Sequence, residues 1–145
     1  MILVDANLLV YAVHRQFEAH VHAKTWLDTR LNGVERVGLP WGALLGFLRL
    51  SANPRVLTRP MALADGAAIV RAWLALTPTW VPQPTDRHAE TLAELLARET
   101  KADLLPDAHL AALAIEHGLT LCSTDRDFAR FEGLRWTDPL RDAPA

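Results

Sequence analysis

Short apolar runs separated by helical segments constrain the fold of this chain more than any other feature of its sequence. The three clearest runs are Ile2–Val4, Val37–Leu39 and Leu119–Cys122. An apolar run without polar alternation is typical of a strand that is buried on both faces of a parallel sheet. In a chain of 145 residues this alternation predicts one domain over residues 1–145. The expected fold class is α/β, a three-layer α/β/α sandwich with a mostly parallel central sheet.

The longer segments between these runs carry apolar side chains at the spacing of one helical face. Predicted helices cover Leu8–Val13, Glu18–Leu31, Pro40–Leu50, Leu63–Leu74, Asp86–Thr100 and Pro106–His117. Pro40 suits the first position of its helix, because the N–H that proline lacks has no partner there. Gly118 is expected to close the last helix as a left-handed residue.

The remaining elements are shorter. A turn with a short helix is predicted between Ser123 and Phe131, and a last strand over Leu134–Trp136 precedes a polar tail that ends at residues 142–145. The two helices on either side of Trp80 are separated only by a brief apolar run. We therefore expect this pair of helices to be an insertion between sheet elements.

Charge and cysteine content limit the partners and the compartment. With 15 Lys and Arg against 17 Asp and Glu, the formal net charge is -2, so the chain has no overall positive field for nucleic acid or membrane. A polyanion must meet a local patch, for which the candidates are Arg15, Arg55, Arg59, Arg126 and Arg130. The single cysteine, Cys122, precludes an internal disulfide, and no apolar run is long enough for a bilayer. The expectation is a cytoplasmic protein without a signal peptide or membrane segment.

Aspartates follow the predicted strands at their carboxyl ends, where ligands bind in parallel sheets. Asp5 follows the first run, Asp125 and Asp127 follow the run ending at Cys122, and Asp107 lies in the first turn of the preceding helix. Each of them alone is compatible with capping a helix. Two carboxylates about 4 Å apart repel by roughly 4 kcal/mol at an effective dielectric of 20, so a convergent cluster needs a cation or shared protons. Oxygen ligands without a histidine or cysteine cluster favour Mg²⁺ or Mn²⁺ over zinc.

Three sequence blocks resemble the PIN domain, and specifically the VapC toxins of bacterial toxin–antitoxin pairs. They are Asp5-Ala-Asn7, the block from Leu105-Pro-Asp107 to Glu-His-Gly118, and the block from Ser123-Thr-Asp125 to Ala-Arg-Phe131. The ending Leu134-Arg-Trp-Thr-Asp-Pro-Leu140 is also similar to one VapC branch. The resemblance covers nearly the whole chain.

The resemblance implies a function and a set of site residues. VapC toxins are Mg²⁺- or Mn²⁺-dependent endoribonucleases that cut structured RNA such as tRNA or rRNA, dimerise and are inhibited by a VapB antitoxin. Carried over by motif, the metal carboxylates are Asp5, Asp107 and Asp125, Asp127 is a further acidic member, and Asn7 and Thr124 are polar supports. Water activated by the metal then attacks the scissile phosphate in line.

This chain departs from the PIN pattern at one position. The family has a glutamate in the helix that here runs from Pro40 to Leu50, and the two plausible registers place Leu44 or Gly46 there. No acidic residue occurs between Glu35 and Asp65. Either the aspartates and water complete the site, or metal affinity is weaker than in the family.

Other readings compete with the ribonuclease hypothesis. A PIN-like module that binds RNA or an antitoxin without cleavage is the non-enzymatic alternative. Phosphoryl transfer through an aspartyl nucleophile, as in haloacid dehalogenases, needs Asp-x-Asp where this chain has Asp5-Ala-Asn7. His14, His20 and His22 are interpreted as solvent-facing or packing residues, since positions two apart on a helix point in different directions.

Overall fold

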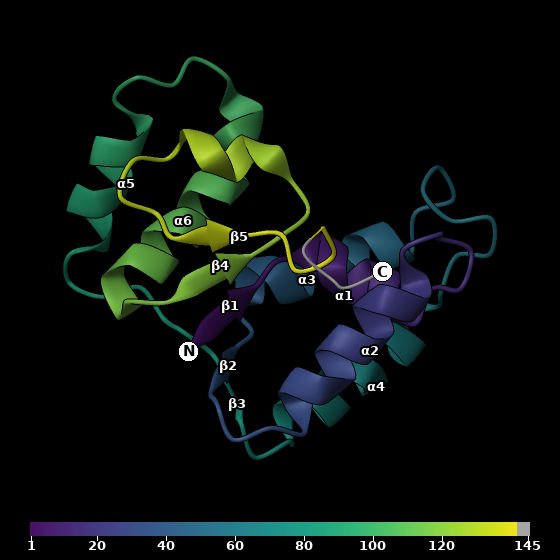
Figure 1. Ribbon diagram of the computed structural model, residues 1–145. Helices are drawn as coiled ribbons and strands as arrows, with labels where there is room; N and C mark the ends of the chain where they lie inside the picture. The colour runs from purple at the N-terminus through teal and green to yellow at the C-terminus, as the bar shows by residue number, and fades with distance from the viewer. Residues whose placement is uncertain (142–145) are drawn as a thin grey trace.

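The computed structural model describes residues 1–141 and contains a five-stranded parallel sheet (Figure 1). The strands are β1 (Ile2–Val4), β2 (Val37–Gly38), β3 (Thr79–Trp80), β4 (Thr120–Cys122) and β5 (Trp136–Thr137). Their order is β3-β2-β1-β4-β5, and each neighbouring pair is parallel. The predicted α/β sandwich is confirmed, with every described strand parallel.

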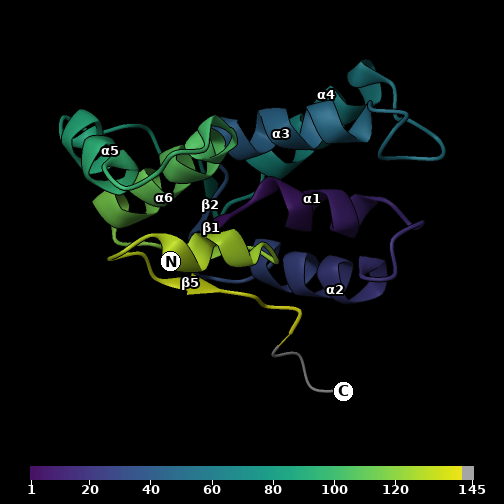
Figure 2. The same cartoon turned by 90° about the horizontal axis from the view of Figure 1, so that it is seen from above.

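Two helices lie between successive strands along most of the chain. They are α1 (Ala6–Val13), α2 (His20–Leu31), α3 (Trp41–Ser51), α4 (Leu63–Leu74), α5 (His88–Leu96) and α6 (Leu105–His117), with the 3-10 helices η1 (Ala102–Leu104) and η2 (Arg126–Arg130). The pair α1 and α2 connects β1 to β2, α3 and α4 connect β2 to β3, and α5 and α6 connect β3 to β4. Figure 2 shows α3 to α6 along one side of the molecule and α2 with η2 along the other.

The predicted insertion between sheet elements was wrong. Thr79 and Trp80 pair with Val37 and Gly38, so the brief run between α4 and α5 is the edge strand β3. A two-residue, partly exposed edge strand leaves almost no apolar pattern in a sequence. The helix pairs are therefore a regular feature of the crossovers.

Several element ends differ from the predicted ones by a few residues. Pro40 is the N-cap of α3 in an extended conformation, so the helix begins one residue later, at Trp41. The helix predicted over Asp86–Thr100 is shorter, because α5 covers only His88–Leu96. Gly118 closes α6 with φ of 65°, as expected.

The core lies around the two central strands. Leu3, Val4 and Leu121 have no exposed surface, because helices cover both faces of the sheet at β1 and β4. Phe47 from α3 and Phe128 from η2 are also fully buried in this core. Among residues 1–141, none of the helices has the length and apolar character that crossing a membrane requires.

The sheet changes direction at β1, which determines where a site can form. From β1 the chain crosses to β2 on one side, whereas β4 occupies the other side. In open parallel sheets, ligands bind in the crevice outside the carboxyl ends of strands at such a reversal. The backbone N–H of Asp5 donates to the carbonyl of Cys122 (3.0 Å), so the segments after β1 and β4 leave the sheet side by side.

Candidate metal centre

Asp5 begins this site directly after β1 and is held on both carboxylate oxygens. Oδ1 accepts the N–H of Ala6 at 2.7 Å, which makes Asp5 the N-cap of α1, and Oδ2 accepts the hydroxyl of Ser123 at 2.7 Å. The side chain is only 8% exposed, and this burial raises the pKa of its carboxyl above the ordinary value.

Ser123 connects the ends of the two central strands. Its fully buried hydroxyl donates to Asp5 and accepts from Asn7 Nδ2 and from the backbone N–H of Asp125, both at 3.0 Å. A hydroxyl has one donor and two acceptor sites, so all of its hydrogen-bonding capacity is used. Ser123 thus fixes the relative positions of Asp5, Asn7 and the loop that carries Asp125.

Ser123 belongs to the Ser123-Thr-Asp125 motif, but no role was predicted for it. The sequence feature that could have identified it is a hydroxyl residue between a buried strand and an acidic loop. Asn7 joins the centre through Ser123, whereas Thr124 contributes its backbone N–H, 3.5 Å from Asn7 Oδ1. Among the described residues, no hydrogen bond of the Thr124 hydroxyl is found.

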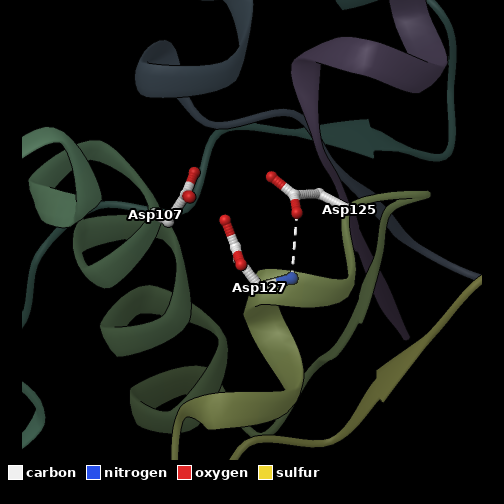
Figure 3. A group of neighbouring side chains, drawn as sticks. All are labelled: Asp107, Asp125 and Asp127. Atoms are coloured by element: carbon white, nitrogen blue, oxygen red, sulfur yellow. Dashed lines mark hydrogen bonds between the residues drawn. The ribbon is translucent and has the colours of Figure 1, made fainter.

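Three further carboxylates converge from two directions (Figure 3). Asp107 projects from the first turn of α6, while Asp125 and Asp127 come from the loop after β4 and from η2. One carboxylate oxygen from each lies within 4.8 Å of the others. Asp125 Oδ1 also accepts the N–H of Asp127 at 2.9 Å, which caps η2. Asp5 is outside this group of three.

Electrostatic repulsion in the centre acts most strongly on Asp107. Burial, the largest cause, and the charges of Asp5, Asp125 and Asp127 together raise the pKa of its carboxyl to about 7. Although Asp5 is outside the group of three, its charge therefore acts on Asp107. In the metal-free centre Asp107 therefore keeps its proton to a higher pH than an ordinary aspartate does.

Helix capping explains the positions of Asp5 and Asp125 but not that of Asp107. Asp5 and Asp125 accept backbone N–H groups at the starts of α1 and η2. Asp107 lies in the first turn of α6 and accepts no hydrogen bond from the part of the chain that the structure describes. A carboxylate without a donor, surrounded by like charges, is suited to a cation. Donors that are all carboxylate oxygens fit a hard divalent ion such as Mg²⁺ or Mn²⁺.

Helix α3 contributes no acidic side chain to this centre. Of the two positions considered for the family glutamate, Leu44 is fully buried in the core. At Gly46, by contrast, a Cβ atom would lie 3.0 Å from the Cβ of Ala6, the residue after Asp5. Position 46 is therefore the one that faces the start of α1.

Most of the histidines serve packing and hydrogen bonding, whereas His22 is exposed to solvent. His14 Nε2 lies 2.9 Å from the Ser51 hydroxyl, and His20 Nδ1 lies 2.8 Å from the Tyr11 carbonyl. His109, two residues after Asp107, bonds through Nδ1 to Nε2 of His88 at 3.0 Å. His88 in turn is bonded to Glu116, whose buried carboxylate also accepts from Thr85. His109 therefore faces α5 and α3.

Comparison with known proteins identifies the family to which this fold belongs. The family model described as PIN domain matches residues 2–134. Ribonuclease VapC37 of Mycobacterium tuberculosis is 45% identical over 140 residues, which cover 96% of this chain and 97% of that protein. Ribonuclease VapC33 of the same organism is 43% identical over 98% of this chain and all of that protein. The chain belongs to the PIN-domain family and, within it, to the VapC ribonucleases.

Solved structures share the fold at lower sequence identity. The Mycobacterium tuberculosis toxin VapC20, described as cleaving the sarcin-ricin loop, aligns with a TM-score of 0.67 at 22% identity, over 93% of this chain and 99% of that one. VapBC2 of Rickettsia felis, bound to a DNA fragment from its promoter, aligns with a TM-score of 0.64 at 15% identity, over 94% of this chain and 98% of that one. These structures confirm the architecture.

Proposed function

We propose that this protein is a divalent-metal-dependent endoribonuclease and the toxin of a VapBC-type toxin–antitoxin pair. The observation that supports it most directly is the convergence of Asp107, Asp125 and Asp127 within 4.8 Å, beside Asp5 at the carboxyl ends of β1 and β4. Two relatives that carry the name Ribonuclease VapC are 45% and 43% identical to this chain and align over nearly their whole length. The acidic centre and the relatives point to the same chemistry.

In this proposal Asp5, Asp107 and Asp125 hold Mg²⁺ or Mn²⁺, and Asp127 is a further acidic member. Such an ion supplies a Lewis acid that polarises the scissile phosphate and lowers the pKa of a water nucleophile. Because the pKa of the Asp107 carboxyl is raised, metal binding near neutral pH has to displace a proton from it, and metal affinity should rise with pH. Ser123 keeps Asp5 oriented, with Asn7 and the backbone of Thr124 supporting the same loop.

The substrate and partners follow from the relatives. We infer a structured cellular RNA, tRNA or rRNA, as substrate, in line with the description of VapC20 as a sarcin-ricin loop cleaving toxin. A VapB-type antitoxin and a second copy of the chain are the expected protein partners, in the cytoplasm. Exposed apolar side chains on α3 and α4, namely Trp41, Leu45 and Leu63, are suited to such an interface.

The test is cleavage of labelled tRNA and rRNA fragments by the purified protein in Mg²⁺, in Mn²⁺ and in EDTA. We expect discrete cuts that require the metal and disappear in Asp125→Asn. Absence of cuts in either metal, with a folded protein, would contradict the ribonuclease proposal.

The absence of an acid from α3 supports a second candidate, a PIN-like module that binds RNA or antitoxin without cutting. The RNA cleavage assay described above distinguishes the two candidate functions. Binding of RNA without any metal-dependent product would favour the module, whereas product formation that EDTA stops would exclude it.

A further inference from the structure

A small cavity lies at the far end of α1 from the acidic centre. Its volume is about 400 Å³, and its lining residues are His14, Arg15, Gln16, Thr58 and Arg59. Both figures of the whole chain show the loop after α3 beside the connection between α1 and α2 (Figures 1 and 2). The lining contains two guanidinium groups and no carboxylate.

Hydrogen bonds fix the loop that forms one wall of this cavity. The Gln16 side chain pairs with the loop as a strand would, because Nε2 donates to the Val56 carbonyl at 3.1 Å and Oε1 accepts the Thr58 N–H at 2.8 Å. Leu57, between these two residues, is 2% exposed and anchors the loop in the interior. The cavity walls are thus preorganised, which lowers the entropic cost of binding.

The two arginines of the cavity have no partner in the part of the chain that the structure describes. Arg30 and Arg130 form ion pairs with Glu35 and Glu99, whereas neither Arg15 nor Arg59 makes an ion pair or hydrogen bond. Unpaired guanidinium groups are good ligands for phosphate, which they bind through two parallel hydrogen bonds. In a chain of net charge -2, such a local concentration of positive charge is the kind of patch a polyanion needs.

We propose that this cavity binds a backbone phosphate of the RNA substrate, away from the scissile bond. This inference rests on the proposed ribonuclease function. Helix α1 rises about 12 Å from its N-cap Asp5 to its last residue Val13, so a phosphate beside Arg15 and Arg59 lies beyond reach of the acidic centre. The cavity therefore contributes to substrate affinity and positioning and takes no part in bond cleavage.

The test measures RNA binding without cleavage. Fluorescence anisotropy of a labelled single-stranded RNA and of an RNA stem-loop is recorded in EDTA over a series of salt concentrations. For Arg15→Gln combined with Arg59→Gln, we expect binding to weaken about tenfold at low salt. For the single-stranded RNA, the slope of log affinity against log salt should become shallower by about 0.7, because the contact with one phosphate is lost.

Matched variants separate a site from a general charge effect. Arg71→Gln combined with Arg98→Gln makes the same charge change at two other exposed, unpaired arginines and should leave the slope unchanged. Arg15→Lys combined with Arg59→Lys keeps the charges and should restore most of the slope. Equal slopes for the cavity and control variants would overturn the proposal.

Two further arms identify the source of the phosphate and isolate the cleavage function. If the cavity variant loses binding of inorganic phosphate but binds RNA normally, the cavity is a phosphate-ion site and the proposal is wrong. If it loses affinity for single-stranded DNA but not for RNA, the proposal is also wrong. In another outcome, the wild type fails to cleave RNA in Mn²⁺ while its salt slope still differs from that of the cavity variant as expected. This result contradicts the ribonuclease function alone, and the RNA-binding cavity stands.

Discussion

Replacing Asp107 by asparagine is expected to stabilise the metal-free protein at neutral and alkaline pH. The pKa of this carboxyl is raised from 3.8 to about 7, so between these values the folded state binds more protons than the unfolded state. The free energy of unfolding must then fall as pH rises through this window, and the loss is complete above pH 7. A shift of this size corresponds to about 4 kcal/mol in a fully buried group. Because Asp107 is only half-buried and partly screened, we expect about 2 kcal/mol.

Urea unfolding in EDTA at several pH values between 4 and 8 measures this effect. The difference between Asp107→Asn and wild type should be small at pH 4 and should favour the variant by about 2 kcal/mol at pH 8. Asp65→Asn is the matched control, since Asp65 is the third residue of α4 as Asp107 is the third residue of α6. The control should show no such gain.

Added Mg²⁺ should reverse the order of the two proteins. An ion that binds only the folded state stabilises it by about 2.7 kcal/mol at a concentration one hundred times its Kd. Wild type should gain this stability and Asp107→Asn should gain much less. A variant that is less stable than wild type at pH 8 in EDTA would refute the electrostatic description of the centre, because Asp107 would then be a structural residue.

Four other substitutions test the remaining parts of the centre. Asp5→Asn should abolish metal-dependent cleavage while circular dichroism shows a retained fold, since asparagine still caps α1 but carries no charge; cleavage at the wild-type rate would remove Asp5 from the ligand set. Ser123→Ala should lower the free energy of unfolding by about 2 kcal/mol in urea titrations, because it leaves buried partners without a hydrogen bond, and a loss below about 0.5 kcal/mol would contradict its connecting role. Gly46→Glu should tighten Mn²⁺ binding in calorimetry, at some cost in packing against Ala6, whereas Leu44→Glu should mainly destabilise the core. Equal Mn²⁺ affinity of the wild type, Gly46→Glu and Leu44→Glu would show that position 46 does not face the metal.

The fold was largely predictable because the central strands are runs of apolar residues, which are typical of strands buried on both faces of a sheet. Three consecutive apolar side chains at Ile2–Val4 fit a strand buried on both faces, and the structure places them there. The edge strand β3 was missed because only two residues pair and both are partly exposed. Helix α5 was predicted too long, since Ala97, Arg98 and Glu99 after Leu96 are good helix formers and no glycine or proline marks the end of the helix. The single domain over residues 1–145 stays a prediction, and its last residues, 142–145, lie outside the described part.

The charged residues of the candidate site could be predicted from the sequence, but the residues that position them could not. The carboxyl ends of parallel strands lie at the same edge of a sheet, so the topology brings aspartates that follow these strands close together. The role of Ser123 was not visible, because its importance lies in three hydrogen bonds to residues up to 118 positions away. Likewise, only the packing of α3 on α1 distinguishes Gly46 from Leu44. Ligation of a metal by Asp5, Asp107 and Asp125 remains a proposal.

The different hydrogen bonding of Asp5 and Asp107 has a consequence for how such a toxin loses its activity during evolution. Asp5 starts a helix and binds Ser123, so most substitutions there remove structure together with charge. Asp107 accepts no hydrogen bond from the described chain, so a neutral residue in its place relieves repulsion and leaves the architecture intact. Under the proposed function, inactivation at position 107 thus yields a protein that has lost cleavage but keeps its architecture.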